Sequence, residues 1–420
     1  MNSYDTALLW EGLEEKGYKV SDKVDVADVY IVNTCTVTNS ANSQSRQIAR
    51  KVKKLNPKAL VIVTGCYAQV NPDEVSKLEC VDYVVGNQEK DQILKLVENA
   101  GPEQEEKVIV GNISKAKSLN YTKLTGFQRK NRAFLRVQDG CDAFCAYCII
   151  PYARGRSRSL SMEEIEDQVL SLSERGYAEI VLTGIHLGGY GLDLPPNKSF
   201  LSLLKKLDDL NIDSRFRISS IEPTEIDDEM IEFLITSKKI CRHLHIPLQS
   251  GDEEILKKMG RKYSPSFYME KIDQIASKWH DVAIGVDVIV GFPGEHDDNF
   301  INSYNLIKNI EASYLHVFPY SIRQGTPAAT MPDHVAPNII KSRSALMREL
   351  GSEKKRAFCR RFLGKRLNTV KVDEKVDGIK ALSDNYIEIN INNRNVEETA
   401  IINAEIERID AGVCYGKVVV

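Results

Sequence analysis

The sequence contains no apolar run approaching the roughly 18 residues that a membrane-spanning helix needs. Residues 1–20 also lack the basic start and apolar stretch of a secretory signal peptide. The formal net charge of -3 gives no overall attraction to nucleic acid, and 42% hydrophobic with 27% charged residues is typical of a soluble globular protein. These absences favour a cytoplasmic protein with no membrane partner. The length of 420 residues exceeds what one hydrophobic core usually serves, so several domains are expected.

The nine cysteines are clustered, which in a reducing compartment favours metal ligands over disulfides. The stretch QDGCDAFCAYCII holds Cys141, Cys145 and Cys148, with no fourth cysteine or histidine close by. Zinc prefers C-x-x-C pairs and four ligands, so the spacing alone makes a zinc site the weaker alternative. A cubane iron–sulfur cluster has four irons, and three thiolates leave one iron free for an outside ligand. The triplet therefore favours a cluster with one open position.

The first part of the chain reads as a small α/β domain over residues 1–115. Short apolar runs at 29–33, 60–64 and 82–86 end in turn-prone residues and are separated by helical patterns. This alternation predicts a parallel sheet. Residues 101–131 are polar and weakly patterned, and we expect a connection there.

The middle part, residues 127–360, predicts a partial (β/α)6 barrel. Six strand-like runs alternate with helical patterns, at 133–137, 179–183, 215–219, 241–246, 283–290 and 313–318. Gly, Pro and Ser gather after each run, where βα barrels carry their active sites, and the cysteine triplet follows the first. Residues 363–420 alternate in short apolar segments, which predicts a small antiparallel β-barrel.

The C-x3-C-x2-C triplet after a first barrel strand resembles the signature of the radical S-adenosylmethionine (SAM) superfamily. The resemblance implies that SAM chelates the open iron and is cleaved to a 5′-deoxyadenosyl radical. It further implies that Tyr147 lies near the adenine and that glycines let the backbone approach the methionine part of SAM. The remaining implied contacts reach ribose, adenine or substrate. The glycines are Gly184, Gly188 and Gly189, and the other contacts are Ser219, Glu222, Gln249, Asp287 and Gly291. Each of these also reads as an ordinary turn or barrel-layer residue.

Two further cysteines each follow a predicted parallel strand directly, Cys35 in NTCTVTNSA and Cys66 in TGCYAQ. Both thiols should therefore lie at one edge of the sheet, where α/β folds bind ligands. With HLHIPLQSGD, DVIVGFPGE and VFPYSIRQGTPAA, these motifs resemble the radical SAM methylthiotransferases across essentially the whole chain. NTCTVTN, GCYAQ, CIIPYARGRSRS and TGIHLGGYG most resemble the members that act on N(6)-threonylcarbamoyladenosine in tRNA. The C-terminal barrel then corresponds to a TRAM domain.

The resemblance implies insertion of a methylthio group at carbon 2 of the modified adenosine at tRNA position 37, just 3′ of the anticodon. Two 4Fe-4S clusters are implied, the second held by Cys35 and Cys66 and delivering sulfur that carries a methyl group from another SAM. The implied partners are a tRNA anticodon loop, an electron donor such as flavodoxin or ferredoxin, and a sulfur source. Two alternatives keep the chemistry but act on isopentenyladenosine in tRNA or on an aspartate of a ribosomal protein. A third is a non-catalytic, zinc-stabilised RNA-binding protein.

The beginning of the sequence departs from the family pattern. Family members open with a strand and a G-C-K-V-N-like turn whose cysteine is the third ligand of the auxiliary cluster, and here Asn2 fits the motif's Asn while Met1 stands where its Val would be. We expect the gene to continue upstream with a Gly-Cys pair, and the chain as printed to cleave SAM without methylthiolating tRNA. Cys80 precedes a predicted strand and is a poor substitute. Cys241, Cys359 and Cys414 match no ligand position.

Overall fold

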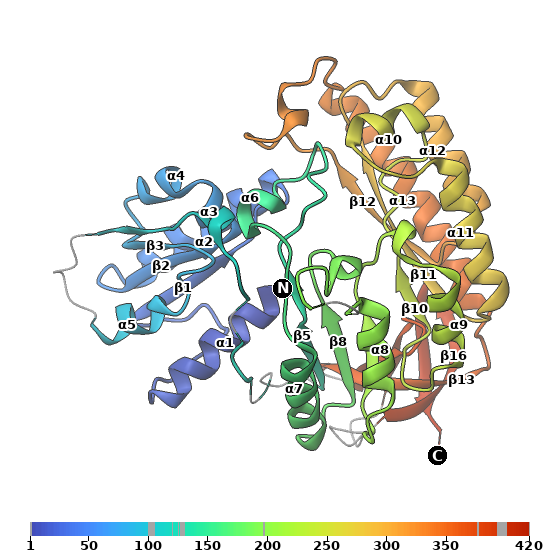
Figure 1. The fold of residues 1–420 in the computed structure, drawn as a ribbon, viewed down its shortest axis with the longest axis horizontal. Coiled ribbons are helices and arrows are strands. Elements are labelled where there is room, and N and C mark those ends of the chain that lie inside the picture. Colours follow the sequence, from blue (N-terminus) through green and yellow to red (C-terminus); the bar gives the residue numbers. More distant parts are fainter. Residues whose placement is uncertain are drawn as a thin grey trace. The chain divides into compact units, whose positions relative to one another are not determined.

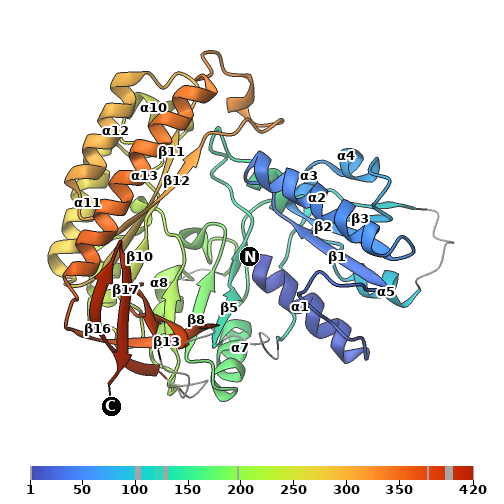
Figure 2. The ribbon, with the colours of Figure 1, turned by 180° about the vertical axis from the view of Figure 1, so that it is seen from behind.

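The computed structural model describes residues 2–99, 106–119, 121–124, 126, 131–195, 198–375, 378–392 and 401–419. The chain forms two compact units (Figures 1 and 2). The first unit contains Met1–Gly126, Gln138–Leu160 and Ser321–Ala329, and the second contains Phe127–Val137, Ser161–Tyr320 and Thr330–Val420. In the part of the chain described, no helix combines the length and apolar character that crossing a membrane requires.

The sheet of the first unit has four parallel strands in sequence order. They are β1 (Val29–Thr34), β2 (Leu60–Gly65), β3 (Tyr83–Val85) and β4 (Val108–Ile109). The predicted parallel sheet is confirmed. The sequence predicts only a connection over residues 101–131, and this prediction is wrong for residues 108–109, which form the strand β4. Two hydrogen bonds hold this short edge strand, from Val84 N to Lys107 O at 2.9 Å and from Gly86 N to Ile109 O at 2.8 Å. Two residues are too few to show a strand period in the sequence.

Helices cover both faces of this sheet, which is why its strands are nearly continuous apolar runs. The helices α1 (Asn2–Glu15) and α5 (Gln92–Glu98) pack Leu9, Leu13, Ile93 and Leu96 on one face. On the other face α2 (Asn39–Leu55), α3 (Cys66–Val70) and α4 (Pro72–Ser76) bring Ala49, Val52, Ala68 and Val75. The side chain of Thr38 starts α2 by accepting a hydrogen bond from Ala41 N at 3.2 Å. The unit also holds η1 (Ile113–Lys115), β6 (Gln138–Asp139), α6 (Ile150–Arg154) and β7 (Arg158–Ser159).

The second unit contains the six predicted barrel strands. They are β5 (Arg132–Arg136), β8 (Glu179–Thr183), β9 (Arg215–Ile218), β10 (His243–His245), β11 (Ala283–Val290) and β12 (Tyr314–Pro319). All neighbours are parallel, in two three-stranded sheets that the bridges Phe216↔Ile240 and Ser220↔His245 connect. Within the described residues β5 and β12 are the free edges, so the strands form an arc, as a partial barrel requires.

One or two helices follow each of the first five barrel strands. After β5, the chain passes through residues 138–160 before it reaches its helix. They are α7 (Met162–Glu174), α8 (Phe200–Asp208), α9 (Asp228–Thr236), α10 (Glu253–Met259), α11 (Pro265–Lys278) and α12 (Asp297–Asn309). Ser161, Ser199, Asp227, Asp252 and Ser264 cap five of these helices with side-chain oxygens. The long α13 (Pro337–Arg360) runs beside β12, as both views show (Figures 1 and 2). Short 3-10 turns are η2 (Leu187–Gly189), η3 (Pro223–Glu225) and η4 (Pro327–Thr330).

The chain ends in a closed β-barrel with strand order β13-β14-β15-β17-β16. The strands are β13 (Arg366–Lys375), β14 (Gly378–Ser383), β15 (Glu388–Ile391), β16 (Ile401–Asp410) and β17 (Val413–Val418). The predicted barrel is present, but it is not wholly antiparallel, because β15 and β17 pair in parallel. Alternating apolar side chains predict that a segment is a strand, and they do not specify which neighbour it joins or in which direction.

This small barrel closes the amino-terminal end of the six-stranded arc. Arg217 donates to Ser383 O at 2.9 Å and Arg215 donates to Leu382 O at 3.0 Å. Both guanidiniums also pair at 2.8 Å with Glu179, whose side chain is completely buried. Burial alone would raise the pKa of Glu179, but Arg217 and Arg215 hold that pKa well below its usual value. Tyr386 comes shortly after Ser383 in the small barrel, and its ring stacks on His243 of strand β10, with ring centroids 4.2 Å apart.

Replacing Glu179 with glutamine tests this buried network. The change leaves arginines buried without an anion, and we expect it to lower the free energy of unfolding by roughly 3–5 kcal/mol. The matched control is Glu229→Gln, which removes an exposed partner of Lys205 and should cost no more than about 0.5 kcal/mol. Urea denaturation at pH 7 measures both. Folding lowers the pKa of Glu179. The stabilisation that this carboxylate gives is therefore complete at a pH above its pKa in the unfolded chain, and it is lost as the pH falls through its pKa in the folded protein. Equal effects of the two variants would contradict a supporting role for the network.

Candidate functional site

The cysteine triplet lies on a closed loop in the first unit, which we call the cysteine loop (residues 138–160). Its two ends pair as the antiparallel strands β6 and β7. Inside it, Gln138 Nε2 donates to Gly140 O at 2.7 Å and to Ser157 Oγ at 2.9 Å. Gly140 has a φ of +75°, and a Cβ there would lie 1.9 Å from Arg156 O. The loop is therefore built around a position that needs glycine.

The three thiols of this loop have the chemistry that a cluster requires. All three are free of disulfides; Cys145 is buried, and Cys141 and Cys148 are partly exposed. Ala143 N donates to Cys141 Sγ at 3.4 Å, and Cys148 N donates to Cys145 O at 2.9 Å. The thiolate is the form of cysteine that binds iron. Three thiols on one loop, one of them accepting from the backbone, fit a 4Fe-4S cluster. Tyr147 is partly buried between the last two cysteines.

Cys35 and Cys66 lie at one edge of the first unit's sheet, as the sequence predicts. They directly follow Thr34 and Gly65, which are register partners at the ends of β1 and β2. Gly65 has a φ of +97°, and a Cβ there would lie 2.4 Å from Thr34 O, so the close approach of the two strand ends depends on glycine. The two thiols thus belong to adjacent strand ends.

The cysteine loop is tied to this sheet edge within the first unit. Asn87, which follows β3, donates through Nδ2 to Cys66 Sγ at 3.8 Å and to Ala153 O at 2.8 Å. Ala153 belongs to the cysteine loop, so one amide connects the two groups of cysteines.

A buried charge network lies beside Cys66. Arg154 is 2% exposed and pairs with Asp5 at 2.9 Å and Asp139 at 3.2 Å, while Lys90 pairs with Asp5 at 2.6 Å. Burial lowers the pKa of Lys90. Burial also opposes the charge of Arg154, but Asp139, Asp5 and Cys66 raise the pKa of Arg154 above its usual value. The thiol of Cys66 therefore lies near buried cationic side chains. The sequence reasoning missed Arg154, Lys90 and Asp5, whose partners are distant in the chain.

A cavity of about 270 Å³ opens next to these cysteines in the first unit. Segments from four places line it, and two of them adjoin ligand candidates, Thr36 after Cys35 and Ile149 after Cys148. The segment after β12 contributes Ile322, Arg323 and Gln324, and it reaches the cysteine loop through a hydrogen bond from Ala328 N to Ala146 O at 2.8 Å. The remaining lining residues are Asn39, Asn42, Arg46, Val70, Asn71 and Glu74.

In the second unit, most of the residues that the resemblance implies for SAM follow the carboxyl ends of the barrel strands. Gly184 comes directly after β8 and Ser219 directly after β9, and Gly291 directly after β11. The exception is Asp287, which lies inside β11. The others lie in the loops after their strands: Gly188, Gly189, Glu222 and Gln249.

These residues differ in whether their polar groups already have partners within the protein. Ser219 Oγ is buried and has no hydrogen-bond partner among the described residues, so it can serve a ligand. Glu222 is ion-paired with Arg261, and burial raises its pKa. A Cβ on Gly188 would lie 2.0 Å from Glu225, and one on Gly291 would lie 2.3 Å from Ile340. Packing within the unit is therefore enough to explain glycine at positions 188 and 291.

Asp287 has two histidine partners inside the arc. Its Oδ1 bonds His245 Nε2 at 2.7 Å and His316 Nδ1 at 3.1 Å. Burial alone would raise the pKa of Asp287, but the hydrogen bonds from the two histidines lower it to about 2. The carboxylate is therefore ionised and held by neighbouring strands, and the sequence reasoning named neither histidine.

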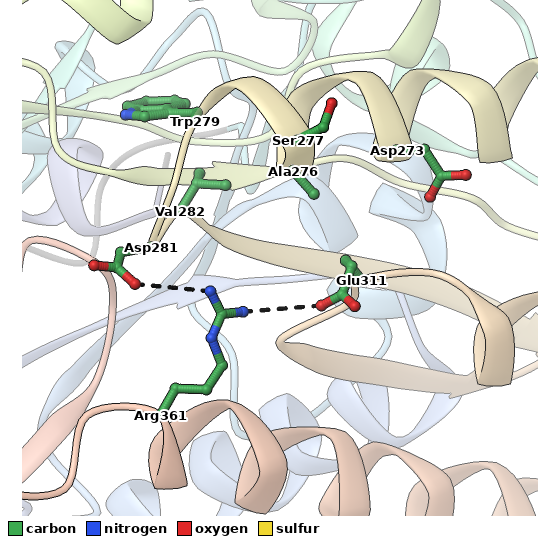
Figure 3. Close-up of a pocket in the computed structure, with 8 residues that line it drawn as sticks. All are labelled: Asp273, Ala276, Ser277, Trp279, Asp281, Val282, Glu311 and Arg361. Atoms are coloured by element: carbon green, nitrogen blue, oxygen red, sulfur yellow. Dashed lines mark ion pairs between the residues drawn. The ribbon is translucent and has the colours of Figure 1, made fainter.

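A larger cavity of about 560 Å³ lies elsewhere in the second unit (Figure 3). Arg361 reaches across it to Asp281 at 3.7 Å and Glu311 at 3.8 Å, and Trp279 lies at its side. Asp281 precedes β11 and Glu311 precedes β12, so the cavity is at the amino-terminal ends of these strands. It is therefore remote from the loops that carry the expected site of this unit.

Comparison with known proteins agrees with this geometry. A model of the radical SAM superfamily matches residues 135–307, and a model described as "Uncharacterized protein family UPF0004" matches residues 1–86. The radical S-adenosylmethionine methyltransferase TsrM from Kitasatospora setae, solved with cobalamin and a [4Fe-4S] cluster, has a similar fold. Its TM-score is 0.58 at 15% identity, over 78% of this chain and 74% of that one. The fold and the cysteine loop thus define a radical SAM protein.

Curated relatives make the assignment more specific. Threonylcarbamoyladenosine tRNA methylthiotransferase MtaB of Bacillus subtilis (strain 168) is 41% identical over 395 residues, 93% of this chain and 87% of the relative. The protein of the same name from Aquifex aeolicus (strain VF5) is 40% identical over 390 residues, 93% of each chain. A tRNA-2-methylthio-N(6)-dimethylallyladenosine synthase from Thermoanaerobacter sp. (strain X514) is 36% identical over 341 residues, 80% of this chain and 72% of the relative. The chain belongs to the MtaB-like radical SAM methylthiotransferases.

Arg154 and Arg156 offer a direct test of the buried network beside Cys66. Replacing Arg154 with glutamine leaves Asp5 and Asp139 without their cation, and we expect a loss of roughly 3–5 kcal/mol in the free energy of unfolding. Arg156→Gln is the matched control, because this side chain is 60% exposed and its pairing with Asp142 is worth about 1 kcal/mol or less. Thermal denaturation followed by circular dichroism measures both, and similar losses would refute the assigned role of Arg154.

Proposed function

We propose that this protein, expressed from its native gene, inserts a methylthio group at carbon 2 of N(6)-threonylcarbamoyladenosine at position 37 of tRNA. The observation that carries the proposal is the arrangement of the first unit. It holds one cysteine group on the loop with Cys141, Cys145 and Cys148 and another at Cys35 and Cys66. Asn87 donates to Cys66 Sγ and to the loop backbone at Ala153 O. Two adjacent thiolate groups suit a reaction that both removes a hydrogen and delivers sulfur.

The three cysteines of the cysteine loop would hold the 4Fe-4S cluster to which SAM binds. That pair would supply the radical chemistry that an unactivated aromatic C–H bond requires. Tyr147 lies on the same loop and would border the adenine of SAM. The contacts proposed in the second unit are Gly184, Gly188, Gly189, Ser219, Glu222, Gln249, Asp287 and Gly291, of which Ser219 has a free buried hydroxyl.

Cys35 and Cys66 would be ligands of the auxiliary 4Fe-4S cluster. Their surroundings fit an anionic group, because Arg154 and Lys90 raise the positive potential at Cys66 and Arg323 does so at Cys35. Buried cations lower the cost of placing thiolates there. The chain's own residues would thus orient the sulfur-delivering group at the sheet edge and keep water from it.

The tRNA anticodon loop is the proposed partner, and two helices supply basic residues for its phosphates. Arg50 and Lys51 are exposed on α2, and Lys355 and Arg360 are exposed on α13. Contacts of this kind weaken with salt. The reaction also needs an electron donor such as flavodoxin or ferredoxin and a sulfur source, and we expect it in the cytoplasm.

A second candidate keeps the chemistry but acts on isopentenyladenosine in tRNA. It is favoured by the relative from Thermoanaerobacter, whose name states action on N(6)-dimethylallyladenosine. Supplying the native gene to a strain that lacks its own methylthiotransferases, then analysing tRNA nucleosides by mass spectrometry, separates the two. We expect the methylthio derivative of threonylcarbamoyladenosine, and the isopentenyl product alone would contradict the proposed substrate.

Each cysteine of the loop should be essential for SAM cleavage. Replacing Cys141, Cys145 or Cys148 with alanine removes one of three protein ligands to the cluster, and we expect formation of 5′-deoxyadenosine under dithionite to be abolished. Cys80→Ala is the control, since this thiol lies against the apolar core of the first unit. A loop variant that forms undiminished 5′-deoxyadenosine would refute the assignment.

Cys35 and Cys66 should be dispensable for SAM cleavage but essential for methylthio transfer. Replacing either with alanine in the native gene should leave 5′-deoxyadenosine formation measurable and remove the methylthio nucleoside from tRNA. If both activities fall together while the cluster of the cysteine loop is still assembled, as Mössbauer spectra would show, the proposed division between the two groups is wrong.

A further inference from the structure

Arg323 is a buried guanidinium with no carboxylate partner among the described residues. Its side chain lies in the first unit and is 6% exposed. Nη1 donates to Asn39 Oδ1 at 2.9 Å and Nη2 to Ser321 Oγ at 3.3 Å, and both acceptors are neutral. Nε is buried with no hydrogen-bond partner, and no carboxylate of the described residues forms an ion pair with this side chain.

Three other buried arginines of the described residues have carboxylate partners. Arg154 pairs with two aspartates, Arg217 with Glu179 at 2.8 Å, and Arg343 with Glu295 at 2.8 Å. A buried charge is costly unless an opposite charge compensates it, and these three follow that rule. Burial lowers the pKa of Arg323, and among its neighbours Cys35 opposes that effect. The missing carboxylate leaves Arg323 Nε available to an anion from outside the chain, in addition to any negative charge at Cys35.

The cavity that Arg323 lines has room for a small polar group and has several polar lining residues. Its volume is about 270 Å³. Asn42 also lines it, and Asn42 Oδ1 is buried without a hydrogen-bond partner. Glu74 is in the lining too, but Arg46 pairs with it at 3.0 Å. The cavity thus presents one unused cationic donor and one unused neutral acceptor.

We propose that this cavity binds the threonylcarbamoyl group of the substrate adenosine, with its carboxylate on Arg323 and its N–H or hydroxyl donor on Asn42. The inference rests on the proposed function and names the residues that recognise its substrate. A threonylcarbamoyl group has one carboxylate, one hydroxyl and ureido N–H donors, which match the two unused groups. An isopentenyl group has neither a charge nor a hydrogen-bond donor. It would leave the guanidinium of Arg323 and the Oδ1 of Asn42 without partners.

The position of the cavity agrees with this role. Thr36 follows Cys35 and Ile149 follows Cys148, so residues next to both cysteine groups line the same space. A substituent held there would keep the attached adenine close to both groups of thiolates. A phosphate of the anticodon loop is the other anion that tRNA could place on Arg323, and it would be bound whatever the base carries.

Binding of two anticodon stem-loop RNAs tests the proposal without requiring turnover. The RNAs differ only at position 37, which is N(6)-threonylcarbamoyladenosine in one and adenosine in the other. Fluorescence anisotropy gives Kd for each with the purified chain, and the ratio of the two Kd values is the readout. We expect the unaltered chain to prefer the modified RNA, and Arg323→Gln to reduce that preference roughly tenfold to a hundredfold.

Two further variants guard against an effect on folding or on general charge. Asn42→Asp is close in size and puts an anion beside the carboxylate, so it should also reduce the preference. Arg50→Gln removes the same charge as Arg323→Gln from an exposed position of the first unit, and it should weaken both RNAs alike. Thermal denaturation of every variant confirms that it is folded.

The outcomes separate this inference from the proposed function. Loss of preference in Arg323→Gln and Asn42→Asp, with the preference kept in Arg50→Gln, supports the assignment. An equal weakening of both RNAs by Arg323→Gln would show a phosphate contact and overturn it. A preference that survives both cavity variants would overturn the inference alone. No preference in the unaltered chain would overturn both the inference and the assigned substrate.

Discussion

The rest of the candidate site depends on the buried guanidinium of Arg154. It lies on the cysteine loop and is held by Asp139 of that loop and by Asp5 of α1, and Lys90 donates to the same oxygen of Asp5. Because all of these groups are buried, each is costly without the others, and the set can exist only when the loop and the sheet edge have the right relative position. The same pairing places positive charge beside Cys66. One buried charge network thus joins the cysteine loop to helix α1 and to the region beside Cys66.

The second unit also contains a buried network of arginines and a carboxylate, and this network attaches the small C-terminal barrel to the strand arc. Glu179 holds Arg215 and Arg217, and these arginines hold the backbone of the small C-terminal barrel. The amino-terminal end of the strand arc is therefore closed by protein, while the Gly-rich loops at the opposite strand ends stay available for a ligand. His245, His316 and Asp287 lie between the two ends, where Asp287 is kept ionised by its hydrogen bonds. A polar interior of this kind suits an arc that receives substrate rather than one filled by apolar side chains.

Local patterns predicted much of this molecule. Most of the barrel strands and the strand β2 of the parallel sheet are buried, so their apolar runs stand out from the polar segments around them. The spacing of Cys141, Cys145 and Cys148 pointed to a cluster, and the position of Cys35 and Cys66 after two parallel strands predicted their shared edge. What the sequence could not show depends on partners distant in the chain. Arg154 and Asp5 are 149 residues apart, and Arg323 and Asn39 are 284 apart. The two-residue strand β4 and the parallel pairing of β15 with β17 likewise depend on the strands that lie beside them in the folded chain, which the local sequence does not specify.

The central claim is that this chain is the methylthiotransferase for threonylcarbamoyladenosine at position 37 of its cell's tRNA. Mass spectrometry of nucleosides from a strain in which the gene is deleted tests it most directly. The account predicts that the 2-methylthio derivative disappears and that threonylcarbamoyladenosine accumulates in its place, while the isopentenyl nucleosides are unchanged. The derivative should return with the native gene and stay absent with its Cys66→Ala form. Undiminished 2-methylthio-N(6)-threonylcarbamoyladenosine in the deletion strain would contradict the account.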